Sequence, residues 1–305
     1  MTLLHTFSIV ARDTQTGNLG VAVQTHWFGV GSLCPWVEAG VGAVATQSMV
    51  EVGYGPKALQ LLKSGETAQK TLETLVAQDK SEALRQVAIV DSRGQVAVHT
   101  GMKCIAYAGH KSGEGFSVQA NMMINETIWP AMYEAYTHAK GDLANRMLAA
   151  LEAGQEAGGD IRGQQSAALL VADAVKSQEP WQHMLVDIRV DDHLQPIKEL
   201  KRLLNIHKAY QLMNEGDDHM AQNKKEKARQ SYQKAAQLAP DYQEFQFWQA
   251  VTLADTGNLD DALPLFKVLF EKNPAWADLL QRLPASGLFN NDKLIMKAIL
   301  DQSMK

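Results

Sequence analysis

Two small hydroxyl side chains begin the first β-rich run of the sequence, and they are the residues best suited to chemistry. Thr6 and Ser8 alternate with Phe7 and Ile9, so a strand over this run would place both hydroxyls on one face. A hydroxyl at the start of a core strand is a nucleophile for amides when its own α-amine accepts the proton. The alternative interpretation is a threonine that simply suits a β-strand.

Polar side chains also stand at the ends of the other strands that the sequence predicts. Strand ends that meet at one edge commonly form a binding site. Each residue also has a structural interpretation, in which His99 is a hydrogen-bonded strand histidine and Cys104 is a buried thiol. We expect one cleft to be lined by Thr6, Gln24, Thr46, Gln119, Asn121 and Arg162. The full set of strand-end residues is Thr6, Ser8, Gln24, Thr46, Gln47, Arg85, Gln86, His99, Thr100, Cys104, Gln119, Asn121, Asp160, Arg162, Gln165 and Ser166.

The sequence has no pattern typical of a metal, nucleotide or cofactor site, so we expect no metal and no cofactor. Its nine histidines are scattered, without the His-Glu-x-x-His spacing, and its cysteines form no Cys-x-x-Cys pair. The glycine-rich residues 109–115 are followed by a β-like run, whereas a phosphate-binding loop leads into a helix N-terminus. We therefore predict an ordinary loop there.

Charge and hydropathy exclude two classes of partner. The chain has 305 residues, a formal net charge of −5 and 46% hydrophobic residues, so it lacks the basic field of a nucleic-acid binder. No run reaches the roughly 18 apolar residues of a membrane span, and residues 1–5 lack the features of a secretory signal. We expect a cytoplasmic protein without nucleic-acid or membrane partners, in which Cys34 and Cys104 are free thiols.

Residues 1–193 predict a domain of strands and paired helices. A hairpin with its turn at residues 12–18 comes first, followed by two helices, a block of strands, two helices and further strands. Two separate helix pairs around antiparallel strands favour two stacked sheets with a helical layer outside each, an α+β fold layered α-β-β-α. Strands after the hairpin are predicted at 41–45, 86–91, 95–100, 103–108, 115–121, 167–172 and 184–190, and helices near 58–62, 67–76, 126–139 and 142–151.

Residues 194–305 predict a separate all-α domain. A period of about 34 residues, which is that of tetratricopeptide helix pairs, aligns small residues with small ones and aromatic residues with aromatic ones. The aligned pairs are Ala228 with Ala262, Tyr232 with Phe266 and Pro240 with Pro274. We predict helices at 198–214, 217–222, 225–238, 242–256 and 259–272, with Leu200, Leu203, Tyr210, Phe247, Trp248 and Phe266 buried.

Six separated motifs resemble one family, the uncharacterised "domain of unknown function 1028" family, which is grouped with the N-terminal nucleophile (Ntn) hydrolases. The motifs occur in the family's order over about residues 5–191, and residues 198–290 resemble a tetratricopeptide-like region, labelled as peptidoglycan-binding, that some members carry. The six motifs lie at residues 6–13, 40–47, 85–91, 99–101, 119–121 and 159–166.

The resemblance implies an Ntn-type sandwich in which Thr6 holds the nucleophile position. By comparison with working Ntn hydrolases, Asn121 would hydrogen-bond the oxyanion, and Asp160 with Arg162 would orient the nucleophile or a substrate carboxylate. The sequence departs from that pattern because five residues precede Thr6. A free α-amine at Thr6 requires cleavage of the His5–Thr6 bond, since removal of Met1 would expose only Thr2.

The sequence therefore supports two alternative functions. The first is an Ntn-type amidohydrolase acting on a small amide or peptide, with catalytic residues Thr6, Ser8, Asn121, Asp160 and Arg162. Its substrate-binding residues would be Gln24, Thr46, Gln47, Arg85, His99, Gln119, Gln165 and Ser166. The second is a non-catalytic binding or scaffold protein that holds a protein or peptide partner with its tetratricopeptide-like helices. We also expect a homo-oligomer.

Overall fold

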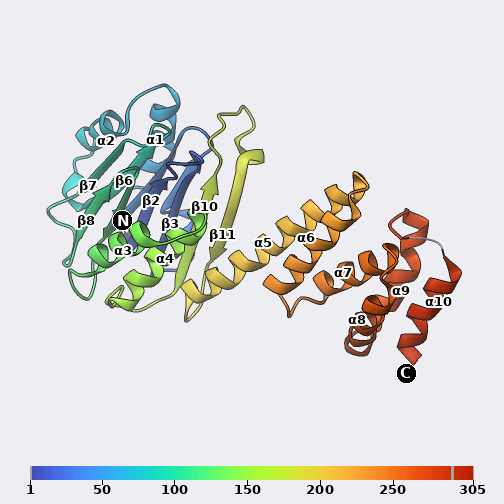
Figure 1. The fold of residues 1–305 in the computed structure, drawn as a ribbon. Coiled ribbons are helices and arrows are strands. Elements are labelled where there is room, and N and C mark those ends of the chain that lie inside the picture. The colour runs from blue at the N-terminus through green and yellow to red at the C-terminus, as the bar shows by residue number, and fades with distance from the viewer. Residues whose placement is uncertain (1, 290–291, 305) are drawn as a thin grey trace. The chain divides into compact units, whose positions relative to one another are not determined.

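Two antiparallel β-sheets form the centre of the first part of the chain (Figure 1). The computed structural model describes residues 2–289 and 292–304 and divides the chain into two units, Met1–Arg202 and Leu203–Lys305. Over these described residues, no helix is long and apolar enough to cross a bilayer.

The first unit contains a five-stranded and a six-stranded sheet, in which every pair of neighbouring strands is antiparallel. In the five-stranded sheet the order is β1 (Thr2–Leu4), β5 (Gly42–Val50), β6 (Arg85–Asp91) and β7 (Val96–Thr100), and β4 (Pro35–Glu38) also pairs with β5. The six-stranded sheet has the order β11 (Met184–Val190), β10 (Ser166–Ala172), β3 (Leu19–Thr25), β2 (Thr6–Arg12), β9 (Phe116–Ala120) and β8 (Gly109–Gly113). The chain therefore passes from one sheet to the other at His5.

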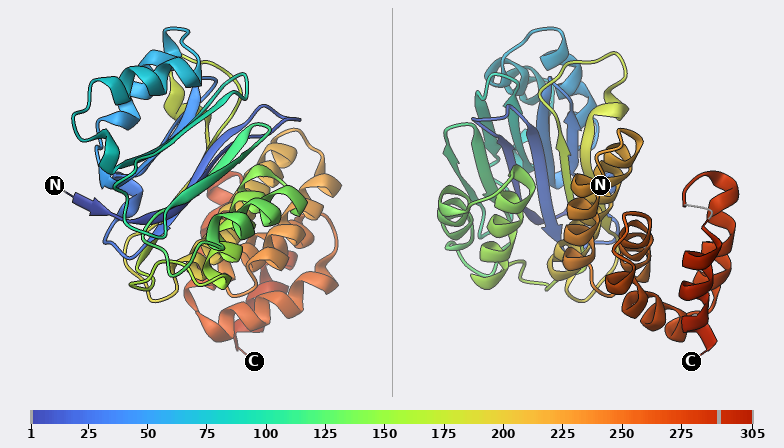
Figure 2. Two further views of the ribbon diagram at one scale, coloured as in Figure 1. Left: turned by 90° about the vertical axis from the view of Figure 1, so that its left-hand side faces the viewer. Right: turned by 45° about the vertical axis from the view of Figure 1, so that its right-hand side comes forward.

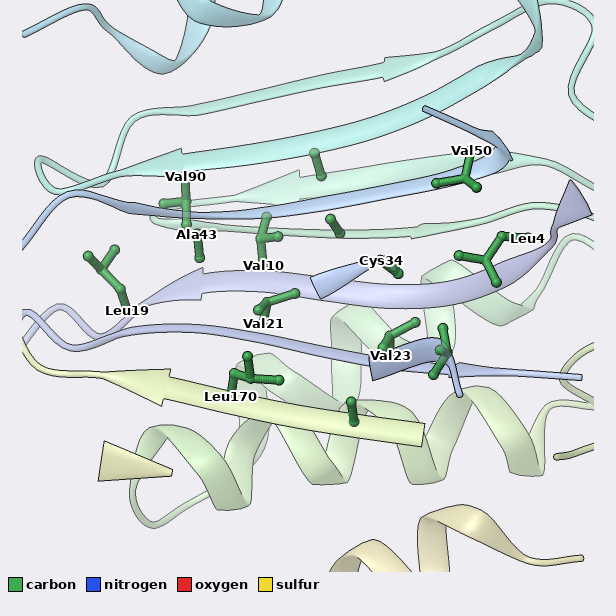
Figure 3. Packing of buried hydrophobic residues seen from close by; sticks show 14 residues of the cluster. Leu4, Val10, Leu19, Val21, Val23, Cys34, Ala43, Val50, Val90 and Leu170 are labelled. Carbon is green, nitrogen blue, oxygen red and sulfur yellow. The ribbon is translucent and has the colours of Figure 1, made fainter. Parts of the chain in front are cut away.

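The main hydrophobic core lies between the two sheets (Figure 3). Alternate residues of each strand point to one face, so Val10 and Val21 from one sheet meet Ala43 and Val90 from the other. All four side chains are fully buried. The same alternation turns residues such as Phe7 and Val44 toward the outer faces.

Helices cover both outer faces, as the views from two sides show (Figure 2). The helices α1 (Tyr54–Lys63) and α2 (Ala68–Ala77) pack against the five-stranded sheet through a cluster that includes Val44. The helices α3 (Ile128–His138) and α4 (Leu143–Glu156) pack against the six-stranded sheet. A glycine in β3 permits this approach, because a Cβ atom at Gly20 would lie 2.5 Å from Met147 Cε. The mixed fold and the two antiparallel sheets agree with the sequence prediction.

One predicted strand and one predicted loop are wrong. Residues 103–108 form no strand, and the glycine-rich loop predicted at 109–115 contains β8. This strand lies at the edge of its sheet, where polar side chains remain accessible to solvent and do not prevent pairing. Lys111 of β8 forms an ion pair with Glu134 of α3 at 3.0 Å.

The described residues of the second unit form helices joined by turns and short irregular segments, without a strand, as predicted for the C-terminal part. Phe247 and Phe266 pack edge to face, with ring centroids 6.2 Å apart, and both are fully buried. The small residues of the repeat, Ala228 and Ala262, are also fully buried. The helices are α5 (Pro196–Ala221), α6 (Lys225–Leu238), α7 (Gln243–Asp255), α8 (Leu259–Lys272), α9 (Ala275–Arg282) and α10 (Lys293–Leu300).

The predicted break between residues 214 and 217 is wrong, because α5 is continuous there. Gly216 instead permits close helix packing, since a Cβ atom at this position would lie 2.5 Å from Tyr232 Cε1. The predicted burial of Tyr210 is also wrong. The residue is 40% exposed, and its hydroxyl donates to Glu244 at 2.9 Å. Of the other predicted core residues, Leu200 is fully buried, whereas Leu203 and Trp248 are partly buried.

Candidate active site

The peptide bond between His5 and Thr6 lies in the protein interior, where the chain crosses between the sheets. His5 is 2% exposed and Thr6 is fully buried. The carbonyl oxygen of His5 accepts two hydrogen bonds, from Thr25 Oγ1 at 2.6 Å and from Arg162 Nη2 at 2.8 Å. Thr25 stands directly opposite Thr6 in the β2–β3 register, which places its hydroxyl beside this bond. The His5 carbonyl is therefore polarised by a hydroxyl and a cation.

The hydroxyl of Thr6 has no hydrogen-bond partner among the residues that the structure describes. Leaving a buried polar group unpaired costs about 1–3 kcal/mol, and native proteins leave few such groups. The carbonyl of the same residue, by contrast, accepts from Asn121 N at 3.1 Å, Gln47 Nε2 at 3.3 Å and Asn121 Nδ2 at 3.4 Å. Thr6 is thus held firmly by its backbone while its hydroxyl is unengaged.

The guanidinium of Arg162 is fixed by a two-pronged ion pair with Asp160. The atom pairs are Nε with Oδ1 at 3.0 Å and Nη2 with Oδ2 at 2.6 Å. Asp160 is 3% exposed and also accepts from the backbone N–H groups of Arg162 at 2.9 Å and His26 at 3.2 Å. The carboxylate therefore orients the cation toward the His5 carbonyl and balances its charge.

The imidazole of His5 is held in one tautomer. Its Nδ1 is 2.8 Å from Asn121 Oδ1, and because an amide oxygen only accepts, Nδ1 carries the proton. Burial lowers the pKa of His5, and the nearby Arg162 cation lowers it further, against the opposing effects of the Asn121 hydrogen bond and Asp160. The ring is therefore neutral near pH 7, with Nε2 unprotonated and unpaired among the described residues.

Side-chain amides join the two sheets beside these residues. Gln86 Oε1 accepts from Gln47 Nε2 at 2.7 Å and from Asn121 Nδ2 at 2.9 Å, while Gln86 Nε2 donates to the Ala120 carbonyl at 2.9 Å. The network continues as Ser8 Oγ donates to Gln47 Oε1 at 2.7 Å and accepts from Gln119 Nε2 at 2.6 Å. These five polar residues are fully buried. A network satisfied in this way fixes the positions of its members.

Two residues next to this network have left-handed backbone conformations. Ser48, which follows Gln47, has φ of 70°, and Met122, which follows Asn121, has φ of 58°. Such conformations cost roughly 1–3 kcal/mol each in residues other than glycine, and they concentrate at functional sites. The strain therefore adjoins both amides that bind the Thr6 carbonyl.

The structure brings together eight of the candidate residues from the sequence. They come from β2, β5, β6, β9, the residue after β9 and the loop before β10, and they are Thr6, Ser8, Gln47, Gln86, Gln119, Asn121, Asp160 and Arg162.

The prediction that Gln24 and Thr46 share this cluster is wrong. Gln24 stands opposite Phe7, one residue out of phase with Thr6, so it lies on the helix-facing side of its sheet. Thr46 stands opposite Val87 on the helix-facing side of the other sheet, and its hydroxyl donates to the Glu51 carbonyl at 3.1 Å.

Four other candidates make contacts outside the cluster. Arg85 pairs with Asp79 at 2.7 Å and also donates to the Met49 carbonyl at 2.5 Å. His99 Nε2 lies 2.8 Å from the Glu82 carbonyl oxygen. Gln165 Nε2 donates to Asp192 at 3.1 Å, and Ser166 Oγ donates to the Trp27 carbonyl and accepts from Val30 N at 3.2 Å.

Sequence reasoning missed His5 and Thr25, and it did not foresee the central place of Gln86. A signal for His5 was present, because a histidine directly before the candidate nucleophile is a polar residue in an apolar context. Thr25 required the hairpin register, and Gln86 required the pairing of β5 with β6.

A surface cavity of about 570 Å³ adjoins the Asp160–Arg162 loop. His26, whose backbone N–H donates to Asp160, forms part of its wall. The other lining residues are Gln164, Gln165, Asp192, His193, Leu194 and Gln195.

A family model described as "Family of unknown function (DUF1028)" matches residues 6–200. The chain belongs to the DUF1028 family. The region that the family model matches begins at Thr6, the first residue of β2. A tetratricopeptide repeat model matches residues 213–275.

A solved structure supports the same relationship. The crystal structure of protein SPO2555 from Silicibacter pomeroyi, described with the DUF1028 family model, is 30% identical to this chain, with a TM-score of 0.60. The similarity covers 66% of this chain and 84% of that one. No curated protein matches the sequence.

Proposed function

We propose that this DUF1028 protein is an Ntn-type amide hydrolase whose nucleophile is Thr6, and that it first cleaves its own chain before Thr6. The observation that carries the proposal is the setting of the His5–Thr6 bond. Its carbonyl oxygen accepts from Arg162 and Thr25, while the adjacent Thr6 hydroxyl has no partner among the described residues. Donors aimed at a carbonyl stabilise the negative charge that nucleophilic attack places on its oxygen.

The first reaction releases residues 1–5, the leader segment. Thr6 Oγ1 attacks the His5 carbonyl carbon through a five-membered ring, and its proton passes to the Thr6 nitrogen as the C–N bond breaks. The resulting ester joins His5 to Thr6 Oγ1. Water hydrolyses this ester, which leaves a carboxylate on His5 and both a free α-amine and a free hydroxyl on Thr6.

The second reaction is the hydrolysis of a substrate amide. The Thr6 hydroxyl attacks the substrate carbonyl while the α-amine accepts its proton and later transfers that proton to the leaving amine. In this proposal Arg162 and Thr25 stabilise the oxyanion, because they already bind the equivalent carbonyl of His5. Asn121, which binds the Thr6 carbonyl, positions the nucleophile.

The layered arrangement of the first unit supports this assignment. Two face-to-face sheets with a helix pair on each outer face are what the resemblance to Ntn hydrolases implies (Figure 2). Because one fold serves many functions, the proposal rests on the residues around Thr6 and not on the layers.

A substrate screen tests the hydrolase directly. Purified protein is assayed against a panel of peptide anilides, in parallel with Thr6→Ala and with Thr137→Ala, a matched change at an exposed threonine of α3. We expect Thr6→Ala to abolish hydrolysis and Thr137→Ala to leave it unchanged. Hydrolysis that survives Thr6→Ala would contradict the proposal.

The tetratricopeptide match favours a second role, the binding of a protein or peptide partner by the helices of residues 213–275. Trp248 is partly buried and packs against both hydrophobic clusters of this unit. The full chain and its variants are tested for binding to a peptide array. Peptides that bind the wild-type chain should bind Thr6→Ala equally well and should not bind Trp248→Ala. Binding that depends on Thr6 instead would assign those peptides to the hydrolase site.

A further inference from the structure

The leader segment lies where the acyl part of a substrate must lie if Thr6 is the nucleophile. In the uncut chain, the residues before Thr6 are attached to the very carbonyl that Thr6 attacks. The contacts of these residues therefore indicate which chemical groups the site can bind on the acyl side of a cleaved bond. This reasoning rests on the proposed function.

The backbone of the leader segment pairs with the edge of a sheet. The strand β1 is antiparallel to the end of β5, with Leu4 opposite Ser48 and Thr2 opposite Val50. Arg85 holds this part of β5 in place through its hydrogen bond to the Met49 carbonyl. Release of β1 leaves the edge of β5 unpaired, and an unpaired edge binds an extended peptide as an added strand.

The side chain of Leu4 occupies an aliphatic pocket. It is fully buried and belongs to the core cluster that also contains Val23, Cys34 and Val50. Figure 3 shows it at one end of that cluster, close to Val50. Departure of the leader segment leaves a pocket that suits a branched aliphatic side chain.

The side chain of His5 occupies a polar pocket. Its Nδ1–H donates to Asn121 Oδ1, whose amide nitrogen is already engaged with Gln86 and the Thr6 carbonyl. This pocket therefore offers an acceptor and suits a neutral side chain that donates a hydrogen bond. A carboxylate in the same place would face the Asn121 oxygen without a donor from it.

We propose that the mature site binds an extended peptide through the edge of β5 and prefers a branched aliphatic residue followed by a neutral hydrogen-bond donor, such as Leu-His, directly before the cleaved bond. The released leader segment is then both the first product and a competitor for the site.

Peptide binding to the processed protein tests the preference. The probe is fluorescein-labelled Thr-Leu-Leu-His with a free carboxylate, measured by fluorescence anisotropy, and its unlabelled variants Thr-Leu-Asp-His and Thr-Leu-Leu-Asp compete with it. We expect each aspartate variant to bind about 10- to 100-fold more weakly, because one loses aliphatic burial and the other loses the Asn121 hydrogen bond. The uncut Thr6→Ala chain should bind no probe, since its own residues fill the site.

The outcomes separate this inference from the proposed function. Processed protein that binds all three peptides equally, or that binds none, would overturn the inference and leave the hydrolase proposal standing. Probe binding by uncut Thr6→Ala would also overturn it, because the peptide would then bind elsewhere. A chain that is never cleaved in any preparation would remove the proposed function and this inference with it.

Discussion

Arg162 has the most specific role of the single residues around the His5–Thr6 bond. It donates to the His5 carbonyl, and its guanidinium is locked by Asp160. Lysine keeps the positive charge but cannot form the same two-pronged pair, so the two residues are not equivalent here. Substitutions of Arg162 can therefore show whether cleavage requires the geometry of the guanidinium or only a positive charge.

We predict that Arg162→Lys and Arg162→Ala slow cleavage of the His5–Thr6 bond. Loss of one oxyanion donor typically costs about 10²- to 10³-fold in rate, and the lysine variant should recover little of it. The first-order rate of cleavage is measured by intact mass over time. Arg189→Lys, at an exposed arginine paired with Asp187 at 2.8 Å, is the matched control and should cleave at the wild-type rate. An Arg162→Ala chain that cleaves at that rate would show that Arg162 is only structural.

The buried imidazole of His5 predicts a pH dependence of stability in the uncut Thr6→Ala chain. Burial lowers the folded-state pKa of His5 below its ordinary value of 6.5, so the unfolded chain binds the proton more readily. The stabilisation is complete above pH 6.5 and is lost as the pH falls from there through the folded-state pKa. Denaturant unfolding at several pH values measures this loss.

His5→Gln in the same background should flatten the stability profile in that pH range. His138→Gln, at an exposed histidine of α3, is the control and should leave the profile unchanged. An identical fall in stability with and without His5 would assign the pH dependence to other groups.

At the scale of elements, a glycine lets α5 and α6 pack closely. Gly216 lies inside α5 against the ring of Tyr232, whose hydroxyl donates to Asp217 at 2.6 Å. Alanine favours helices by about 1 kcal/mol over glycine, but a side chain forced into a filled space costs about 1–3 kcal/mol. At this position the cost of crowding the Tyr232 ring is therefore larger than the gain in helix propensity.

We predict that Gly216→Ala lowers the melting temperature of the second unit despite its higher helix propensity. Asn205→Ala, at an exposed position of the same helix, should leave the melting temperature unchanged or raise it slightly. Thermal unfolding followed by circular dichroism compares the two variants. A Gly216→Ala protein that melts higher than wild type would show that Tyr232 moves aside without cost.

The elements that could be predicted from sequence are those with a strong local signal. Hydrophobic alternation and the repeat of about 34 residues were sufficient for the two antiparallel sheets and the C-terminal helices. The face of the sheet on which Gln24 lies could not be predicted from these signals. The turn after Asp13 sets the hairpin register, and a shift of one residue would move Gln24 to the face of Thr6. The cluster around Thr6 likewise depends on pairings between residues more than a hundred positions apart, such as Thr6 with Asn121.

At the scale of the whole first unit, the buried amides connect the two sheets. Gln86 and Gln47 belong to the five-stranded sheet, and Ser8, Gln119 and Asn121 belong to or directly follow strands of the six-stranded sheet. Most of the space between the sheets is filled by apolar side chains. Apolar contacts are non-directional, whereas hydrogen bonds between amides require a defined geometry. The network therefore fixes the position of Asn121 and Gln47 relative to Thr6.

We predict that Gln86→Leu destabilises the protein by at least about 2 kcal/mol, because one N–H of the Gln47 amide and one of the Asn121 amide remain buried without an acceptor. Gln95→Leu, at an exposed residue, should change stability by less than about 0.5 kcal/mol. Chemical denaturation of both variants in the Thr6→Ala background provides the comparison. Equal stability of the two would mean that the network contributes nothing to holding the sheets together.

The central claim is that Thr6 becomes the N-terminal residue by cleaving the bond before it, and the intact mass of the purified protein tests this most directly. The account predicts that the wild-type chain reaches the mass of a chain beginning at Thr6, while Thr6→Ala keeps residues 1–5 under the same conditions. Thr6→Ser, which retains the hydroxyl, should still be cleaved. A wild-type protein that keeps residues 1–5, or a Thr6→Ala protein that loses them at the same rate, would contradict the claim.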